Sequence, residues 1–312
     1  MKVFLSGADG FLGSNLIREL LARGHEVRAM VQIGRNYSTI EGLPVEIVAG
    51  DLLDERTVFP AIEGCDAVVH TAASTTIWPA RRLITRRINI DGTRNMLEAA
   101  KRARVRRFVH IGTATSFAHG TRSAPGDESG GYVGEKFGLD YMDSKYLGHR
   151  LVKEAARRGD VPAVEVNPTF MFGPYDRAPG PGKIILRVCR GEVPGSAKGG
   201  KNCIAVKDVA VGIANALEMG RIGESYILGN RNMSYNELFN TVAAIVGKEV
   251  PQRIFPNWIV RLTGCALTVS GVMRRVEPRL SVRMAKVSCA PFYYSPAKAI
   301  RELQLPQSPV EE

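Results

Sequence analysis

A tyrosine and a lysine four residues apart, Tyr141 and Lys145, are the pair in this sequence best suited to acid–base chemistry. Residues at that spacing lie on one face of a helix. A tyrosine with a pKa of about 10 is a poor base at neutral pH, and a cation within about 4–6 Å favours its phenolate. Such a phenol can exchange a proton with an alcohol or carbonyl oxygen while a hydride moves on carbon.

A second pair, Tyr132 and Lys136, has the same spacing. Three glycines surround it, so a regular helix is disfavoured there and the two side chains need not align. The segment Asp140–Arg158, in contrast, has the pattern of a long helix that begins next to Tyr141. The sequence therefore favours Tyr141, and the duplicate shows that the spacing alone is unspecific.

Hydroxyl side chains follow an apolar run at Arg107–Ile111. The carboxyl ends of strands in parallel sheets open onto the ligand crevice, where a hydroxyl can orient a reacting oxygen. Thr113 is the first choice for this role, with Thr115 and Ser116 as alternates. The competing interpretation is a hydroxyl that caps its own backbone.

Three glycines spaced by three residues, Gly7, Gly10 and Gly13, lie between an apolar run at Lys2–Ser6 and a helical pattern at Phe11–Arg23. Glycine lets the backbone turn tightly and approach a pyrophosphate, because it has no Cβ. The N-terminus of the following helix offers free N–H groups and a positive dipole end to phosphate. In this context the pattern predicts a dinucleotide-binding turn.

The stretch Val27–Arg35, which would hold the adenosine ribose, contains no acidic residue. NAD-binding units usually place Asp or Glu there, about 20 residues after the glycines. Gln32 and Arg35 are present instead, with Arg28 as a second arginine. A guanidinium attracts a 2′-phosphate, so NADP(H) is favoured with Arg35 as its partner, and NAD(H) stays open. Merely solvated arginines are the alternative.

Two further strand ends could meet the same cofactor. Asp51 follows the run Val45–Ala49, and its carboxylate could accept a hydrogen bond from an adenine amino group. A turn or helix-cap role for this residue is equally compatible. Thr71-Ala72-Ala73 follows the run Ala67–His70, where small side chains would let a cofactor lie against the backbone.

Strands and helices alternate through the first half of the chain, which predicts parallel βαβ units in a doubly wound, Rossmann-type α/β fold. The expected strands are Lys2–Ser6, Glu26–Gln32, Val45–Ala49, Ala67–His70, Arg107–Ile111 and Ala163–Val166. The expected helices are Phe11–Arg23, Glu55–Glu63, Asn95–Arg104 and Asp140–Arg158.

After about residue 168 prolines and glycines become dense, and the pattern changes. We expect residues 1–168 to form a dinucleotide-binding domain, with residues 203–230 returning to it. Residues 169–202 and 231–312 should then form a smaller, mostly helical substrate-binding lobe.

The composition is that of a globular protein, with 45 % hydrophobic and 23 % charged residues among 312. A net charge of +11 favours an anionic partner, such as a phosphorylated cofactor, nucleic acid or an acidic membrane surface. The basic stretches near Arg81–Arg87 and Lys101–Arg107 have few aromatic residues among them, so a solvated basic face is favoured and no nucleic acid is expected.

Five scattered cysteines without a CxxC pair indicate neither a disulfide framework nor a zinc site, so we expect a cytoplasmic protein without a metal. Glycines end the N-terminal apolar run too early for a secretory signal. The uncharged segment Leu262–Met273 is shorter than the roughly 18 residues of a membrane span and has arginines on both sides. It predicts a buried or interfacial helix, and a peripheral membrane contact is a minor alternative.

Several motifs occur in the order of a known family. They are Gly7-Ala8-Asp9-Gly10-Phe11-Leu12-Gly13, His70-Thr71-Ala72-Ala73, Asn89-Ile90-Asp91-Gly92-Thr93, Tyr141 with Lys145, and Asn167-Pro168 with Gly173-Pro174. Over almost its whole length the chain resembles an extended short-chain dehydrogenase/reductase of the NAD-dependent epimerase/dehydratase superfamily. It is most similar to the dihydroflavonol-reductase-like branch, near the 3β-hydroxysteroid dehydrogenases.

The resemblance implies a role for each motif. Tyr141 would be the proton donor or acceptor, and Lys145 would hold the nicotinamide ribose and lower the tyrosine pKa. Thr113 would position the substrate oxygen, and Asn89 would serve the fold and a proton relay. The implied cofactor contacts are Gly7, Asp9, Gly10, Phe11, Leu12, Gly13, Gln32, Arg35, Asp51, Leu52, Thr71, Ala72, Ala73, Lys145, Asn167 and Pro168. Family members often dimerise through the helices that here contain Asn95–Arg104 and Asp140–Arg158, so a homodimer is expected.

The implied activity is NAD(P)-dependent interconversion of a secondary alcohol and a ketone, or reduction of an aldehyde, on a moderately hydrophobic small molecule. Sugar-nucleotide dehydratases of the superfamily carry Asp-Glu after the catalytic threonine, where this chain has Ala114-Thr115. Epimerases usually carry an arginine for the substrate diphosphate, and Lys201 is the nearest equivalent here. A nucleotide-sugar epimerase and a non-catalytic NADP-binding sensor are the alternative functions.

Overall fold

A seven-stranded parallel sheet forms the centre of the molecule in the computed structural model, which describes residues 1–177 and 180–311. Its strand order is β10-β6-β5-β4-β1-β2-β3, so the direction of winding reverses between β1 and β4. The strands are β1 (Lys2–Ser6), β2 (Glu26–Gln32), β3 (Glu46–Gly50), β4 (Ala67–His70), β5 (Arg107–Ile111), β6 (Ala163–Pro168) and β10 (Ser225–Leu228). The predicted doubly wound α/β fold is confirmed.

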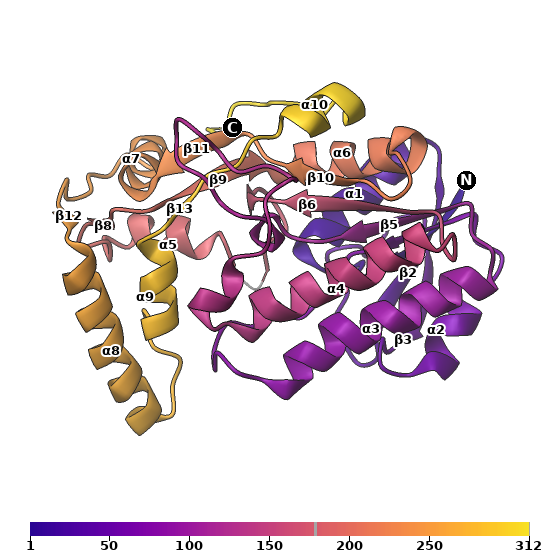
Figure 1. Ribbon diagram of the computed structural model, residues 1–312, viewed down its shortest axis with the longest axis horizontal. Helices are drawn as coiled ribbons and strands as arrows, with labels where there is room; N and C mark the ends of the chain where they lie inside the picture. The colour runs from indigo at the N-terminus through magenta and orange to yellow at the C-terminus, as the bar shows by residue number, and fades with distance from the viewer. Residues whose placement is uncertain (178–179, 312) are drawn as a thin grey trace.

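Helices cover both faces of this sheet (Figure 1). Alternate residues of a strand point to opposite faces, so Val3 and Leu5 of β1 enter one apolar core and Phe4 enters the other. The first face is covered by α1 (Phe11–Ala22), α6 (Val206–Met219) and α10 (Ala297–Leu303). The second is covered by α2 (Glu55–Ile62), α3 (Leu83–Arg102) and α4 (Asp140–Arg157). Burial on both faces explains why the strands are apolar throughout.

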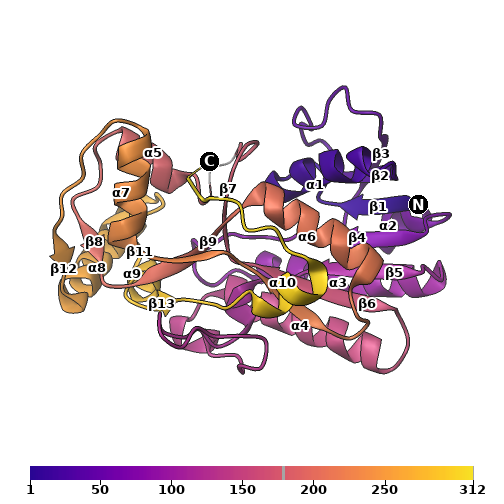
Figure 2. The same ribbon diagram turned by 90° about the horizontal axis from the view of Figure 1, so that it is seen from above.

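A smaller lobe of helices and short strands extends from one side of the sheet domain (Figure 2). Its helices are α5 (Lys183–Cys189), α7 (Tyr235–Ile245), α8 (Asn257–Arg274) and α9 (Val282–Ser288). Its strands are β7 (Phe170–Phe172), β8 (Ser196–Ala197), β9 (Gly200–Ala205), β11 (Arg231–Ser234), β12 (Ile254–Phe255) and β13 (Pro291–Phe292). Among the described residues, no helix combines the length and the apolarity needed to cross a bilayer.

Helix α3 differs most from its expected boundaries, because it begins at Leu83 and not near Asn95. Its first half carries arginines, β-branched residues and Gly92, which weaken the helical signal in the sequence. A tertiary contact fixes its start: the carboxylate of Asp140 accepts a hydrogen bond from the backbone N–H of Arg82 at 2.6 Å. Tertiary context here overrides propensity.

The chain crosses repeatedly between the sheet domain and the lobe. Residues 203–230 contribute α6, which packs on α1, and β10, which pairs with β6 at the sheet edge. The segment that contains α10 also returns, and Leu303 and Leu305 are buried in the same core as α1 and α6. The sheet domain is therefore completed by residues from both ends of the sequence.

Candidate active site

The three glycines of the first turn have three different environments. Gly7 has a φ of +69°, and a Cβ there would lie 2.8 Å from the backbone of Ala72. A Cβ on Gly13 would lie 2.1 Å from the carbonyl oxygen of Gly7, whereas one on Gly10 would meet that atom at 3.2 Å. Within the described chain, no side chain caps the N-terminus of α1, and its first turn has no acidic residue. The turn thus fits a dinucleotide pyrophosphate.

The other expected cofactor contacts lie in or beside the loops that follow the carboxyl ends of the strands. They are Asp9, Phe11 and Leu12 after β1, Leu52 after β3, Thr71, Ala72 and Ala73 after β4, and Asn167 and Pro168 at the end of β6. The Thr71 hydroxyl donates to the carbonyl of Ser6 at 2.5 Å, which ties the loop after β4 to the glycine turn. Leu12 and Leu52 are buried, so their part in any cofactor site is steric or through the backbone.

The residues predicted to contact the adenosine ribose lie in different environments. Arg35 Nε donates to the Gln32 side chain at 3.2 Å, and both are exposed, Gln32 as the last residue of β2 and Arg35 in the loop after it. Arg28, in contrast, lies inside β2 and donates to the carbonyls of Ala61 and Glu63 at 2.9 and 2.7 Å. It is thus engaged against α2 and its following turn, which removes it as a 2′-phosphate partner.

A second guanidinium, which the sequence reasoning missed, reaches the loop after β2. Arg177 Nη1 donates to the Ser38 hydroxyl at 2.8 Å and to the Asn36 side chain at 3.2 Å. Arg177 lies about 140 residues further along the chain, so only the folded structure brings it here. This loop therefore has arginines on two sides, Arg35 and Arg177.

Asp51 serves its own loop. One carboxylate oxygen accepts a hydrogen bond from the backbone N–H of Leu53 at 2.9 Å, and the backbone N–H of Asp51 donates to the Thr57 hydroxyl at 3.0 Å. This is the turn role that the sequence left open. The carboxylate remains partly exposed at the end of β3, next to β2 in the sheet.

Thr113, Tyr141 and Lys145 converge at the carboxyl end of β5. The Thr113 hydroxyl, just beyond that strand, interacts with the Tyr141 phenol at the start of α4. One helical turn later, Lys145 donates from Nζ to the carbonyl of Ile111 in β5. Thr113 also caps a short turn, and its hydroxyl lies 3.2 Å from that of Thr115. The structure therefore brings the three residues together and gives Thr115 a neighbouring place.

Burial shifts both titratable groups of this set toward their neutral forms. Loss of solvent raises the pKa of Tyr141, and the interaction with Thr113 opposes the rise. Burial lowers the pKa of Lys145 to about 8, with the Glu165 carboxylate opposing. The expected depression of the tyrosine pKa is thus not found in the free protein. At neutral pH Tyr141 is a protonated phenol and Lys145 is mostly a cation.

Tyr132 and Lys136, the second pair with this spacing, contact different partners. The Tyr132 hydroxyl donates to the Asp143 carboxylate at 2.6 Å, and its ring stacks on Tyr146 with centroids 4.3 Å apart. Lys136 is exposed and lies over the ring of Phe137. Burial and the neighbouring carboxylate raise the pKa of Tyr132. The two residues therefore share no site.

Asn89 joins the loop after β4 to helix α4. Its side chain accepts from the backbone N–H of Ser74 at 2.7 Å and donates to the carbonyl of the same residue at 3.0 Å. It also donates to the Ser144 hydroxyl at 2.9 Å. With its amide engaged in this way, Asn89 positions α4 and the residue next to Ser144, which is Lys145.

A buried polar row beneath Lys145 escaped the sequence reasoning. Strand pairing aligns His70 of β4 with His110 of β5, His110 with Glu165 of β6, and Glu165 with Ser225 of β10. All four are buried, and we call them the polar row. Both ring nitrogens of His110 and Oε1 of Glu165 have no hydrogen-bond partner among the described residues. Burial lowers the pKa of His70 to about 3, so its ring is neutral.

The end of β6 borders the polar row. Asn167 donates to Glu165 at 3.3 Å, and a Cβ on Gly112 would lie only 2.0 Å from the Asn167 side-chain oxygen. Gly112 is therefore required for the close approach of β5 and β6 side chains at this point. No sequence motif marked this glycine.

A cavity of about 750 Å³ lies in the lobe. Its lining is mainly apolar and includes Ile77 and Trp78 from the loop after β4, Ile184 of α5, Phe239 of α7, Ile259 of α8 and Met284 of α9. Ile77 and Met284 also pack in the apolar cluster that contains Tyr141. We call this cavity the apolar chamber. Neither Thr113 nor Tyr141 is among the described residues that line it, so this shared cluster is what links the chamber to the candidate catalytic set.

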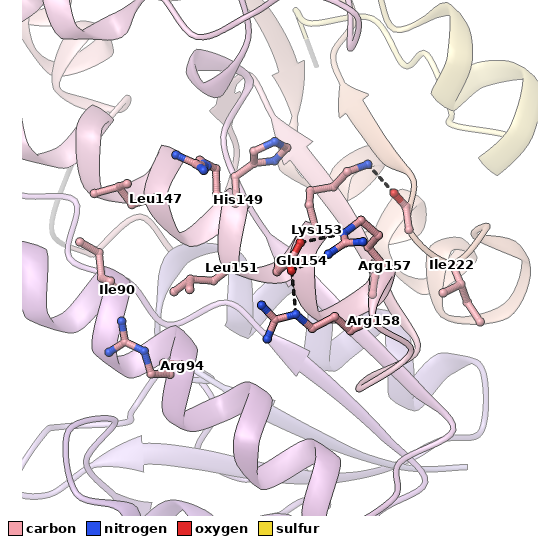
Figure 3. A pocket seen from close by; sticks show the side chains of 13 residues that line it. Ile90, Arg94, Leu147, His149, Leu151, Lys153, Glu154, Arg157, Arg158 and Ile222 are labelled. Atoms are coloured by element: carbon pink, nitrogen blue, oxygen red, sulfur yellow. Dashed lines mark hydrogen bonds and ion pairs between the residues drawn. The ribbon is translucent and has the colours of Figure 1, made fainter.

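A separate groove of about 920 Å³ runs over the outer faces of α3 and α4. Figure 3 shows Arg94, Leu147, Leu151 and the ion pairs of Glu154 with Arg157 and Arg158 around it. Neither Thr113 nor Tyr141 lines this groove.

Comparison with known proteins agrees with this geometry. Residues 3–229 match the model of the NAD dependent epimerase/dehydratase family. The chain belongs to this family. As a member it is an NAD(P)-dependent oxidoreductase of the extended short-chain dehydrogenase/reductase type.

Three relatives illustrate the relationship. A candidate dihydroflavonol 4-reductase of Synechocystis sp. is 33 % identical over 99 % of this chain and 91 % of its own length. The sterol demethylase protein B of Methylococcus capsulatus is 32 % identical over 91 % of this chain and 85 % of its own. The crystal structure of gox2253 has a TM-score of 0.86 and 31 % identity, covering 99 % of this chain and 94 % of that one.

Proposed function

We propose that the protein interconverts a secondary alcohol and a ketone, or reduces an aldehyde, on a hydrophobic substrate held in the apolar chamber. The observation that carries this proposal is the Thr113, Tyr141 and Lys145 set, whose tyrosine packs in one apolar cluster with two residues that line the chamber, Ile77 and Met284. The relatives reported above are named for a dihydroflavonol and a sterol, neither of which is a sugar nucleotide.

The protonation states favour carbonyl reduction as the reaction that the free site is ready to perform. Tyr141 holds its proton at neutral pH and can donate it to a carbonyl oxygen that Thr113 orients. The nicotinamide, when bound, supplies the hydride that the carbonyl carbon accepts. Lys145, held by the carbonyl of Ile111, is a nearby cation for the phenolate that remains. In the oxidative direction the same residues act in reverse.

We propose NADP(H) as the preferred cofactor, with its 2′-phosphate between Arg35 and Arg177. Both guanidiniums border the loop after β2, and Val27–Arg35 has no carboxylate to repel a phosphate. The glycine turn would hold the pyrophosphate.

We also retain the expectation of a homodimer built on α3 and α4. The groove on these helices supports it, because it presents leucines next to arginines of both helices and the acidic Glu154. Size-exclusion chromatography with light scattering tests this expectation. Arg81 and Arg86 of the basic stretch pair with Asp140, which supports a structural role for them and not one in nucleic-acid binding.

The decisive experiment is a fluorescence titration with NADPH and NADH, followed by turnover of a panel of hydrophobic ketones and aldehydes. Tight NADPH binding with turnover supports the proposal. Preference for NADH would refute the 2′-phosphate site. Cofactor binding without turnover of any carbonyl would favour an epimerase or a sensor, and a sugar-nucleotide panel would then distinguish the two.

A further inference from the structure

Helix α8 exposes an apolar stripe to solvent. Six of its residues, Trp258, Leu262, Cys265, Val269, Val272 and Met273, are exposed, and we call them the α8 stripe. At 100° per residue they fall within an arc of about 100° on one side of the helix. The side chains of Trp258 and Met273, at its two ends, are 66 % and 80 % exposed. Figure 1 shows α8 as the outermost helix of the lobe.

The opposite side of α8 is occupied. Gly264 and Gly271 are buried against α9 and the loop that precedes it, and a Cβ on Gly264 would lie 2.6 Å from that of Ala285. Ile259, Val260 and Thr263 line the apolar chamber. The helix is thus a wall with the chamber on one side and the exposed stripe on the other.

The charges around the stripe are of one sign. The helix Asn257–Arg274 contains no Asp or Glu. Arg261 borders the stripe, and Arg274, Arg275 and Arg279 follow its C-terminal end, all exposed. The nearest acid in sequence, Glu277, pairs with Lys183 at 4.0 Å.

We propose that the α8 stripe inserts into the headgroup region of an anionic phospholipid bilayer, so that the apolar chamber fills from the membrane. A helix with an apolar face and arginines at its borders lies in the interface plane, and its affinity rises with buried apolar area and with anionic lipid. Filling of the chamber from the membrane rests on the proposed function, because it assumes a hydrophobic substrate in the chamber. Insertion of the stripe into the bilayer does not depend on that function.

A second copy of this chain is the less suitable occupant. A two-fold contact between antiparallel α8 helices would bring Arg261 of one copy near Arg274 and Arg275 of the other. Juxtaposed like charges without a carboxylate on either helix oppose that contact. An anionic bilayer, in contrast, neutralises all of them.

The test is flotation of the purified protein with vesicles of phosphatidylcholine alone and with added phosphatidylglycerol. We expect binding to the anionic vesicles that falls with salt, and a blue shift of Trp258 emission that is lost in W258F. The double variant V269E/V272E should weaken binding at least about tenfold. Its matched control is I245E/I300E, which places the same charges on exposed isoleucines of α7 and α10. R274Q/R275Q should cost about thirtyfold on anionic vesicles only.

Equal binding by V269E/V272E and the wild type, or none of the protein on anionic vesicles, would overturn the proposal. A wild-type dimer in solution that V269E/V272E dissociates would identify a second copy as the occupant. Turnover of a water-soluble carbonyl, measured without vesicles, reports on the proposed function separately. If that turnover survives in V269E/V272E while turnover of a vesicle-borne carbonyl falls, delivery from the membrane is supported.

Discussion

The Nδ1 atom of His149 lies 2.5 Å from Oε2 of Glu165, which joins helix α4 to strand β6 inside the protein. His149 follows Lys145 by one helical turn, so the helix that carries the reactive pair is anchored to the polar row. Ser225 donates to the same carboxylate oxygen at 2.9 Å. A buried carboxylate with these two hydrogen-bond donors fixes the position of α4 relative to the sheet.

Replacement of Tyr141 by Phe should reduce kcat by about 10²-fold or more, because the proton donor is lost. The affinity for NADPH should stay nearly unchanged. Tyr132→Phe is the matched control, since it removes the phenol of the second pair and only its bond to Asp143. Steady-state kinetics with a hydrophobic ketone, together with cofactor titration, check both. Full activity in the Tyr141 variant would show that the proton comes from another group.

Lys145→Met should stabilise the free protein at pH 7 while abolishing turnover. The folded-state pKa of Lys145 is lowered to about 8 from its usual 10.5, so its charge costs folding free energy below pH 8. That cost disappears as the pH rises from about 8 to above 10, because the unfolded chain then loses the proton as well. Urea unfolding should show a gain of roughly 1–3 kcal/mol at pH 7 that shrinks toward pH 10. A gain independent of pH would contradict the assignment.

Glu165→Gln should lower the free energy of unfolding by about 2–4 kcal/mol at pH 7, because it breaks a buried pair. Burial works to raise the pKa of Glu165, but the bonds from His149, Ser225 and Asn167 overcome it and leave the pKa lowered. The contribution is therefore present above the carboxyl's ordinary pKa and is lost as the pH falls through its folded value.

Glu154→Gln is the control for this change. It removes only exposed ion pairs with Arg157 and Arg158, which typically contribute less than about 1 kcal/mol. Denaturant unfolding at several pH values measures both variants. Equal losses of unfolding free energy in the two variants would show that the buried pair stabilises the fold no more than the exposed ion pairs do.

Arg35→Ala should weaken NADPH binding about 10- to 100-fold and leave NADH binding unchanged, because a charge-assisted bond to the 2′-phosphate is lost. Arg177→Ala should act in the same direction. Arg56→Ala, which removes an exposed guanidinium paired with Asp54, serves as the control. Isothermal titration with both cofactors distinguishes these cases, and a parallel loss of NADH affinity would point to a structural role for Arg35.

The parts of the fold that could be predicted are those whose signal is local. The strand β1 followed by three glycines and a helix needs only neighbouring residues, and so does the spacing of Tyr141 and Lys145. The polar row could not be predicted, because its alignment depends on strand register across more than a hundred residues. Arg28 was considered for the cofactor because it lies close in sequence to Gln32. Its position within β2, and not the sequence distance, decides what it contacts.

Burial of Leu303 and Leu305 in the core that also contains Leu5 and Leu16 has a consequence for biosynthesis. A ribosome delivers β1 to β6 first, β10 after only the first part of the lobe, and α10 after α7, α8 and α9. Until α10 is made, the apolar surface that α6 and β10 present to it remains exposed. Completion of the core of the sheet domain is therefore coupled to translation of the lobe.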